Sequence, residues 1–213
     1  MRKTILFLFI ILLGIGTMQV NAAGMTSQQK TEAIAKINAA ASGLKSMSCN
    51  FVQTKYLSLL SDKMVSEGKM YYRQSDKLRW EYTSPYTYLF IFNGSKVYVG
   101  GKSRKDVIDT NTNKIFKEVA RIMMNTVTGK ALSNSSDFSV GIDSAANTWI
   151  VTLVPKKKDI KQMFTKIVLT FTKSNTMISE INIYEKNGDR TNIKLNNIAV
   201  NTTLNESLFA IPR

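Results

Sequence analysis

The chain has 213 residues, and its 29 lysines and arginines outnumber its 15 aspartates and glutamates, which gives a formal net charge of +14. This excess of positive charge favours anionic partners, such as lipid headgroups, nucleic acid or an acidic protein face. The sequence contains no histidine, which excludes the Ser-His-Asp and Cys-His arrangements of hydrolases and most zinc and copper sites.

Residues 1–22 have the pattern of a secretory signal peptide. Arg2 and Lys3 precede an apolar run from Ile5 to Ile15, and the small residue Ala22 offers a cleavage site. The apolar run is shorter than the roughly 20 residues that a membrane-spanning helix needs. We therefore predict cleavage after Ala22 and export of a single domain over residues 23–213. Export makes nucleic acid an unsuitable partner.

The first predicted helix covers Ser27 to Leu44. Apolar side chains recur there at helical spacing, a hydroxyl residue is available as the N-cap, and Gly43 marks the end. Cys49 follows, between Met47 and Phe51, and fits a small buried hydrophobic residue. Since one cysteine cannot form an internal disulfide, the fold must be stabilised by packing.

Beyond Cys49 the pattern changes to short segments rich in aromatic and β-branched residues. Short connections between them, such as the Asn93-Gly94 turn, favour antiparallel pairing of successive strands. A second helix, apolar nearly all round, is expected at residues 115–127, and residues 104–112 are expected to form a loop or a short strand. The predicted strands cover residues 48–59, 64–74, 77–83, 88–99, 138–143, 148–155, 164–172, 177–185 and 189–200.

No set of residues points to catalysis. The acidic residues are few and scattered, and neither a nucleophile elbow nor a glycine-rich phosphate loop occurs. The polar segment at residues 106–113 lacks the glycine and the terminal acid of a calcium-binding loop. We therefore expect a protein that is not an enzyme and that has no cofactor and no metal site.

Several short motifs occur in order along the chain. The first half contains Phe51-x-Gln53, Gly68 before an aromatic strand, Arg73, Leu78-x-Trp80, Pro85 and a turn from Asn93 to Tyr98. The second half contains Leu153-x-Pro155, Ile181-x-Ile183, Gly188-Asp189 and the closing Leu208-Phe209-x-Ile211-Pro212. In order and spacing these motifs resemble the LolA family, the periplasmic carriers of outer-membrane lipoproteins, over almost the whole chain after the signal peptide.

The resemblance implies a mainly β fold with α: an incomplete, strongly curved antiparallel β-barrel, or half-barrel, lidded by helices around a hydrophobic cavity for acyl chains. It implies a periplasmic chaperone that takes lipoproteins from an ATP-driven inner-membrane complex and ferries them to an outer-membrane acceptor. We expect such a carrier to act as a monomer. Two alternatives stay open, a carrier of another lipid such as free phospholipid, and a lipid- or lipoprotein-sensing regulator with the same half-barrel.

Strand alternation suggests which side chains line such a cavity. Residues two apart share a face, so Leu78, Trp80 and Tyr82 lie together. The run from residue 89 to 92 is apolar on both faces, so the sequence does not decide which of its faces lines the cavity. For each residue, ordinary core packing is the alternative. The predicted lipid-binding residues are Leu78, Trp80, Tyr82, Leu89, Ile91, Met123 and Met124.

Two further roles are predicted for basic residues. Arg73 matches the family arginine that hydrogen-bonds the backbone of the helical lid and holds the empty cavity shut, which a guanidinium can do through its several donors. A surface or salt-bridge arginine is the alternative. A dense basic cluster could meet acidic faces of the inner-membrane complex or anionic headgroups, or could simply be solvated. The cluster consists of Lys156, Lys157, Lys158 and Lys161.

Overall fold

The computed structural model describes residues 24–60, 62–74, 76–101, 105–132 and 136–212. The predicted signal peptide, residues 1–22, lies outside the described residues. Within the described residues, none of the helices has the length and apolar character needed to span a membrane.

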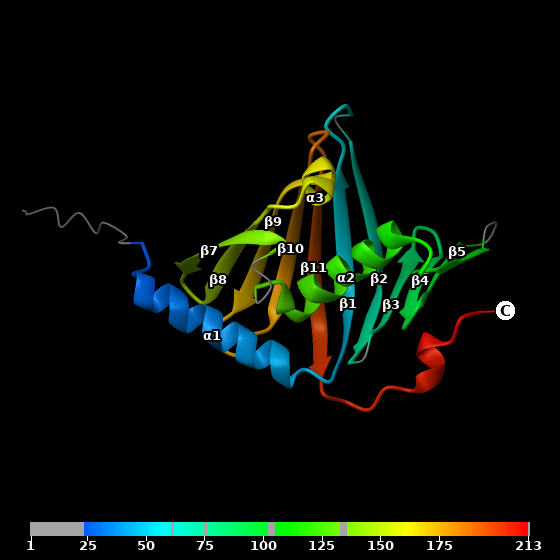
Figure 1. The fold of residues 1–213 in the computed structure, drawn as a ribbon, viewed down its shortest axis with the longest axis horizontal. Coiled ribbons are helices and arrows are strands. Elements are labelled where there is room, and N and C mark those ends of the chain that lie inside the picture. The colour runs from blue at the N-terminus through cyan, green and yellow to red at the C-terminus, as the bar shows by residue number, and fades with distance from the viewer. Residues whose placement is uncertain (1–23, 61, 75, 102–104, 133–135, 213) are drawn as a thin grey trace, which may run out of the picture.

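Within the part of the chain that the structure describes, eleven antiparallel strands form one curved sheet (Figure 1). The strands lie in the order β6-β5-β4-β3-β2-β1-β11-β10-β9-β8-β7, so two meanders join through the pairing of β1 with β11 and the barrel stays open between β6 and β7. The predicted half-barrel, mainly β with α, is confirmed. The strands are β1 (Ser46–Tyr56), β2 (Lys63–Arg73), β3 (Lys77–Ser84), β4 (Tyr88–Asn93), β5 (Lys96–Gly101), β6 (Lys105–Asp109), β7 (Phe138–Ala145), β8 (Thr148–Pro155), β9 (Phe164–Thr172), β10 (Ile178–Glu185) and β11 (Arg190–Val200).

Helix α1 (Ser27–Gly43) begins as its sequence predicts. The Thr26 hydroxyl accepts a hydrogen bond from the backbone N–H of Gln29, and the Gln29 side chain accepts one from the backbone N–H of Thr26. This reciprocal capping satisfies two backbone donors that the first turn leaves unpaired. The helix buries only three small or branched side chains, Ala33, Ile37 and Ala41, so most of its surface faces solvent.

Helix α2 (Lys114–Thr128) crosses the concave side of the sheet, in front of β1, β2 and β11 (Figure 1). It contributes Ala120, Ile122 and Val127 to the hydrophobic core. Gly129 has a φ of +80° and ends the helix before the short 3-10 turn η1 (Lys130–Leu132), a backbone conformation that favours glycine. The second predicted helix is therefore confirmed, and it forms the lid of the half-barrel.

Two short helical segments were not predicted. Helix α3 (Lys158–Met163) lies between β8 and β9 and buries only Ile160, which is too weak a pattern to read from sequence. The 3-10 turn η2 (Glu206–Phe209) places the fully buried Phe209 against the outer, convex face of β3 and β4. Asn93 of β4 donates a hydrogen bond to the Phe209 carbonyl at 3.0 Å, so the C-terminal segment is held on that face.

The aromatic core under α2 depends on Gly68. The Phe51 ring lies 4.5 Å from the ring of Trp80 and meets Tyr82 edge-on at 5.2 Å, measured between ring centroids. A Cβ atom on Gly68 would lie 2.5 Å from Cζ of Phe51 and 2.0 Å from the backbone oxygen of Glu81. Only glycine allows Phe51 to occupy this place.

Candidate functional site

A cavity of about 310 Å³ lies between α2 and the concave face of the sheet. Its wall is mainly apolar, with branched aliphatic side chains from β9, β10 and β11 on one side and the aromatic side chains of β3 on the other. Four side chains of α2 cover it. The lining residues are Gln53, Lys55, Trp80, Tyr82, Ile122, Met123, Thr126, Val127, Phe164, Ile167, Ile181, Ile183, Thr191 and Ile193.

The structure brings three of the predicted lipid-binding residues together in this wall. Trp80 and Tyr82 of β3 face Met123 of α2 across the cavity. Leu78 and Met124 are buried in the adjoining core and do not line the cavity. That the lining residues bind lipid remains a prediction.

The predicted positions of Leu89 and Ile91 require correction. In the β3–β4 pairing, Trp80 lies opposite Phe90 and Arg79 lies opposite Ile91. Because directly paired residues share a face, Leu89 and Ile91 point to the convex side, away from the cavity. The run is apolar on both faces because the C-terminal segment covers the convex side of β4, where Ile91 is fully buried.

The sequence reasoning missed the aliphatic half of the wall. Ile181, Ile183 and Ile193 alternate with polar residues along β10 and β11, and Ile167 lies between Lys166 and Val168 on β9. Directly paired positions join Ile167, Ile183 and Thr191 across the three strands. The alternation was visible in the sequence. What was missing was the order of the strands, which brings these rows opposite Trp80.

Two polar groups sit in the aromatic part of the wall. The Tyr82 hydroxyl donates a hydrogen bond to Oε1 of Gln53 at 2.9 Å, and burial raises the pKa of Tyr82, so the phenol stays protonated at neutral pH. The indole Nε1 of Trp80 is buried without a hydrogen-bond partner among the described residues, a state that costs about 1–3 kcal/mol.

Lys55 lies at the rim of the cavity within a small ionic network. Its ammonium is 3.2 Å from a carboxylate oxygen of Glu185 and 3.5 Å from one of Asp189. Asp189 also accepts a hydrogen bond from the backbone N–H of Ser58 at 2.9 Å, and this bond is the main cause of the lowered pKa of its carboxyl. The network ties the β1–β2 hairpin to the β10–β11 turn.

A second ionic network holds the lid helix to the sheet. Asp137, just before β7, is 1% exposed, and its carboxylate oxygens lie 2.6 Å from Nη1 of Arg121 on α2 and 2.7 Å from Nζ of Lys157. Burial alone would raise the pKa of Asp137, but the hydrogen bonds from Lys157 and Arg121 outweigh it, so the pKa lies below its ordinary value. Arg121 also pairs with Glu118 on its own helix.

Arg73 contacts the C-terminal segment. Its Nη1 donates a hydrogen bond to the Leu204 carbonyl at 3.4 Å, and Nη2 pairs with Glu206, which also pairs with Lys77. The hydrogen-bond partners of Arg73 therefore lie on the tail after β11. In the role implied by the resemblance, the partners are backbone groups of the lid helix. The latch role of Arg73 stays a prediction.

The predicted basic cluster is divided by the fold. Lys156 and Lys157 belong to the β8–α3 connection, and Lys157 pairs with the buried Asp137. Lys158 and Lys161 lie on α3 with exposed side chains. Lys156 is exposed as well, and docking of a partner at these lysines stays a prediction.

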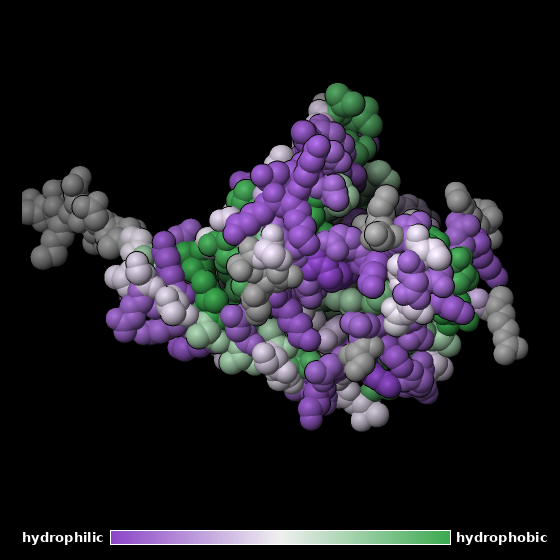
Figure 2. All heavy atoms as spheres, viewed as in Figure 1, coloured by the Kyte–Doolittle hydropathy of each residue, from purple (hydrophilic) through white to green (hydrophobic). Residues whose placement is uncertain are grey.

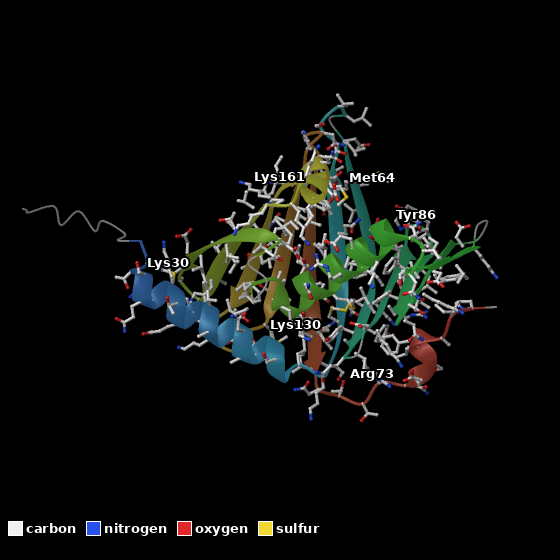
Figure 3. The ribbon with its side chains drawn as sticks, viewed as in Figure 1. Lys30, Met64, Arg73, Tyr86, Lys130 and Lys161 are labelled. Carbon is white, nitrogen blue, oxygen red and sulfur yellow. The ribbon has the colours of Figure 1, made fainter. Side chains whose placement is uncertain are left out.

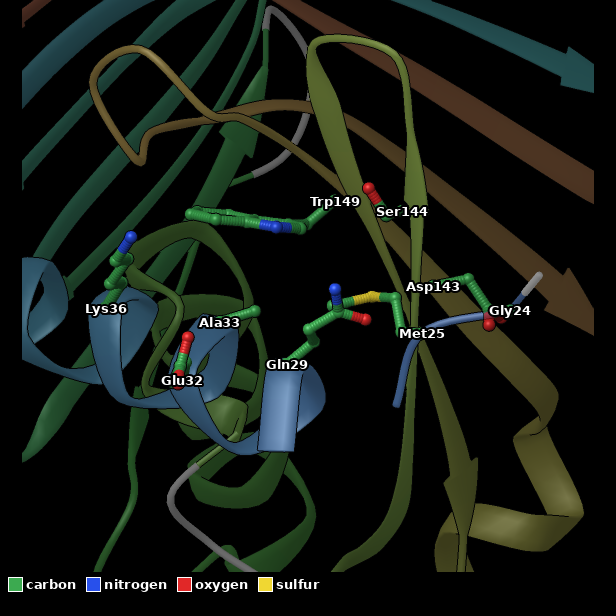
Figure 4. Close-up of a pocket in the computed structure, with 9 residues that line it drawn as sticks. All are labelled: Gly24, Met25, Gln29, Glu32, Ala33, Lys36, Asp143, Ser144 and Trp149. Carbon is green, nitrogen blue, oxygen red and sulfur yellow. The ribbon is translucent and has the colours of Figure 1, made fainter. Parts of the chain in front are cut away.

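A second cavity, of about 450 Å³, lies between the start of α1 and the β7–β8 hairpin (Figure 4). Gln29, Glu32 and Lys36 of α1 border it on one side, and Trp149 of β8 borders it on the other. Its lining is mixed in polarity. Among the residues that the structure describes, no three histidine, cysteine, aspartate or glutamate side chains come together as a metal site requires.

Comparison with known proteins decides the family. The sequence model of the outer membrane lipoprotein carrier protein LolA matches residues 42–212. The chain belongs to the LolA family. An outer-membrane lipoprotein carrier protein of Legionella pneumophila (strain Corby) is 27% identical over 205 residues, which cover 95% of this chain and 92% of that protein. Another, of Chromobacterium violaceum, is 23% identical over 195 residues, covering 89% of this chain and 87% of that protein.

Solved structures share the fold of this LolA-family chain. An uncharacterized conserved protein from Thermus thermophilus has a TM-score of 0.51 at 10% identity, with 84% of this chain and 91% of that chain covered. The structure of the Pseudomonas aeruginosa MucA/MucB complex has the same TM-score and identity, with 84% of this chain and 60% of that chain covered. At such identity these likenesses concern the fold alone.

Proposed function

We propose that this LolA-family protein is a periplasmic chaperone that carries acylated lipoproteins with their acyl chains in the cavity beneath α2. The observation that supports this most is the cavity itself, about 310 Å³ in volume and walled by aliphatic and aromatic side chains. Exposing an acyl chain of about sixteen carbons to water costs on the order of 10 kcal/mol of free energy, at ~0.8 kcal/mol per methylene. A carrier must shield that surface.

The size of the cavity suggests how cargo enters. Ligand sites commonly span about 300–1,000 Å³, so the cavity is at the small end of that range. A lipid anchor with several chains therefore requires α2 to move outward. Met123 suits such a lid because its unbranched, flexible side chain can repack as chains enter and leave.

Membership of the LolA family suggests which steps come before and after carriage of the lipoprotein. We propose that the protein acts as a monomer, receives lipoproteins from an ATP-driven inner-membrane complex and releases them to an outer-membrane acceptor. No step in this cycle needs a catalytic residue, because binding and release are changes of partner.

The test is binding of a fluorescent acyl probe to the purified mature protein, with displacement by a synthetic triacylated lipopeptide. Ile183→Trp, which enlarges a half-buried wall residue, is expected to weaken probe binding at least about tenfold, since overfilling a cavity removes room for the chain. Val154→Trp is the matched control, because Val154 is 45% exposed and lies outside the cavity. Equal binding by both variants would contradict the proposed site.

The bound molecule distinguishes the carrier functions. Mass spectrometry of protein isolated from the periplasm without detergent is expected to find lipoprotein or acylated peptide. Free phospholipid alone would instead support a carrier of another lipid, the alternative that the same apolar wall allows.

A further inference from the structure

The hairpin between β1 and β2 ends in an exposed apolar tip. Leu59 is 94% exposed and Leu60 is 59% exposed, and Met64, at the start of β2, is 46% exposed. Figure 2 shows this group of hydrophobic residues at one extremity of the molecule, beyond a largely hydrophilic surface. Single exposed apolar residues are common on proteins, but adjacent leucines at a protruding tip are a feature of surfaces that contact a partner or a membrane.

The tip is held on a firm base. The Ser58 backbone N–H donates to Oδ1 of Asp189 at 2.9 Å, and the Ser58 hydroxyl donates to the backbone oxygen of Asn187 at 2.9 Å. These bonds fix the β1–β2 hairpin to the β10–β11 turn directly before Leu59. The leucines are therefore presented to solvent by an anchored segment.

Exposed lysines surround the tip. The β10–β11 turn is joined to α3 by a hydrogen bond from the backbone N–H of Lys186 to the Met163 carbonyl at 3.0 Å, so these segments lie at the same end as the tip (Figure 1). Lys161 and Met64 mark this end in Figure 3. The exposed charged residues here are four lysines, Lys63, Lys158, Lys161 and Lys186, against two acids, Asp62 and Asp159.

The cavity approaches the same end of the molecule. Lys55 and Thr191 line the cavity and are directly paired on β1 and β11, and the next pair toward the tip is Tyr56 with Arg190. We call this end the apex: Leu59, Leu60, Met64, the β10–β11 turn and α3. Cargo that leaves the cavity at its Lys55 rim would emerge close to the apex.

We propose that the apex is a membrane-contact surface, in which Leu59 and Leu60 insert into the interfacial region of an anionic bilayer and the surrounding lysines bind its phosphate headgroups. A bilayer interface deforms around a protruding apolar tip, so no preformed pocket is required. Basic residues beside the inserted side chains add attraction to anionic lipid. The inference goes beyond the proposed carriage of cargo and is tested on empty protein.

The experiment is flotation of the purified mature protein with vesicles of phosphatidylcholine containing anionic phosphatidylglycerol, and with vesicles of phosphatidylcholine alone. We expect flotation with the anionic vesicles and markedly less with neutral vesicles or at high salt. Leu59→Ser is expected to lower the partition coefficient about tenfold or more. Lys158→Glu combined with Lys161→Glu is expected to lower it by a similar factor, and only for anionic vesicles.

Val107→Ser is the matched control, because Val107 is 54% exposed on the edge strand β6, and it should float as the parent does. A fluorophore on Leu59→Cys should shift to the blue with anionic vesicles, whereas one on Val107→Cys should not. Cys49 does not interfere, since it is buried and burial raises the pKa of its thiol to about 12.

Failure of the parent protein to float, equal flotation of the Leu59→Ser variant, or an unshifted Leu59 label would each overturn the proposal. If Leu59→Ser weakened contact with a protein partner but left flotation unchanged, the membrane proposal would also be overturned. Acyl-probe binding, measured on the same variants, should be unchanged, so failure at the apex is distinguished from failure of the cavity.

Discussion

Replacement of Asp137 by asparagine removes the negative charge that joins the lid helix to the sheet. In the parent, this buried carboxylate lies 2.6 Å from Arg121 and 2.7 Å from Lys157. Removing one partner of a fully buried ion pair costs about 3–5 kcal/mol. The cost should be smaller here, because the Arg121 and Lys157 side chains are 29% and 51% exposed and can regain water, and because Arg121 keeps Glu118.

We therefore expect Asp137→Asn to lower the free energy of unfolding by about 1–3 kcal/mol at pH 7. For a domain of this size that corresponds to a fall in Tm of about 3–9 °C, measured by calorimetry. Amide hydrogen exchange in α2 should also become faster, because the lid loses a contact with the sheet. Asp143→Asn is the control, since Asp143 is exposed and the same chemical change there should stay within about 0.5 kcal/mol.

The effect should depend on pH in one direction. The folded-state pKa of Asp137 is lowered, so its stabilisation is fully present above the unfolded-state pKa of about 3.9 and is lost as pH falls through the folded-state value. The stability difference between parent and Asp137→Asn should thus be constant from pH 7 to about pH 5 and narrow at more acidic pH. A variant as stable as the parent at pH 7, or a difference that widens in acid, would refute the reasoning.

Three further variants or treatments test other parts of the structure. Gly68→Ala should destabilise the protein by about 1–3 kcal/mol, because the added Cβ meets the Phe51 ring and backbone, whereas Gly43→Ala, with nothing within 4 Å, should be neutral or slightly stabilising. Cys49 should react with a thiol reagent at pH 8 only upon unfolding, since its pKa is raised to about 12; rapid labelling of the native protein would disprove its burial. Arg73→Leu should keep the fold but impair lipoprotein delivery in cells, and unchanged delivery would count against the latch.

The sequence predicted those features of the fold that arise from local patterns. A hydroxyl residue at the N-cap predicts the start of α1, and alternation along β3 puts Trp80 and Tyr82 on one face. Pattern alone could not choose the face of the next strand, because residues 89–92 are apolar on both sides. The convex side is covered by Phe209, which lies more than a hundred residues later in the chain, and no local pattern reports that contact.

The apex and the ion pairs of Asp137 could not be predicted from the sequence, for the same reason. Leu59 was predicted to end a strand, whereas the structure places Leu59 and Leu60 in an exposed tip that is anchored by the bonds between Ser58 and the turn at Asp189, 131 residues later in the sequence. Asp137 stood in a polar segment without a motif. Its role emerges only when the fold brings Arg121 and Lys157 to it from different elements.

Photo-crosslinking in living cells tests most directly whether acyl chains occupy the cavity beneath α2. A photoreactive amino acid at Met123, in the cavity wall, is compared with the same residue at Val107, on the exposed edge strand. We expect lipoprotein acyl chains to be captured at Met123 and not at Val107. Capture of lipoprotein at Val107 alone, or of none at either position while lipoproteins still reach the outer membrane, would contradict carriage in this cavity.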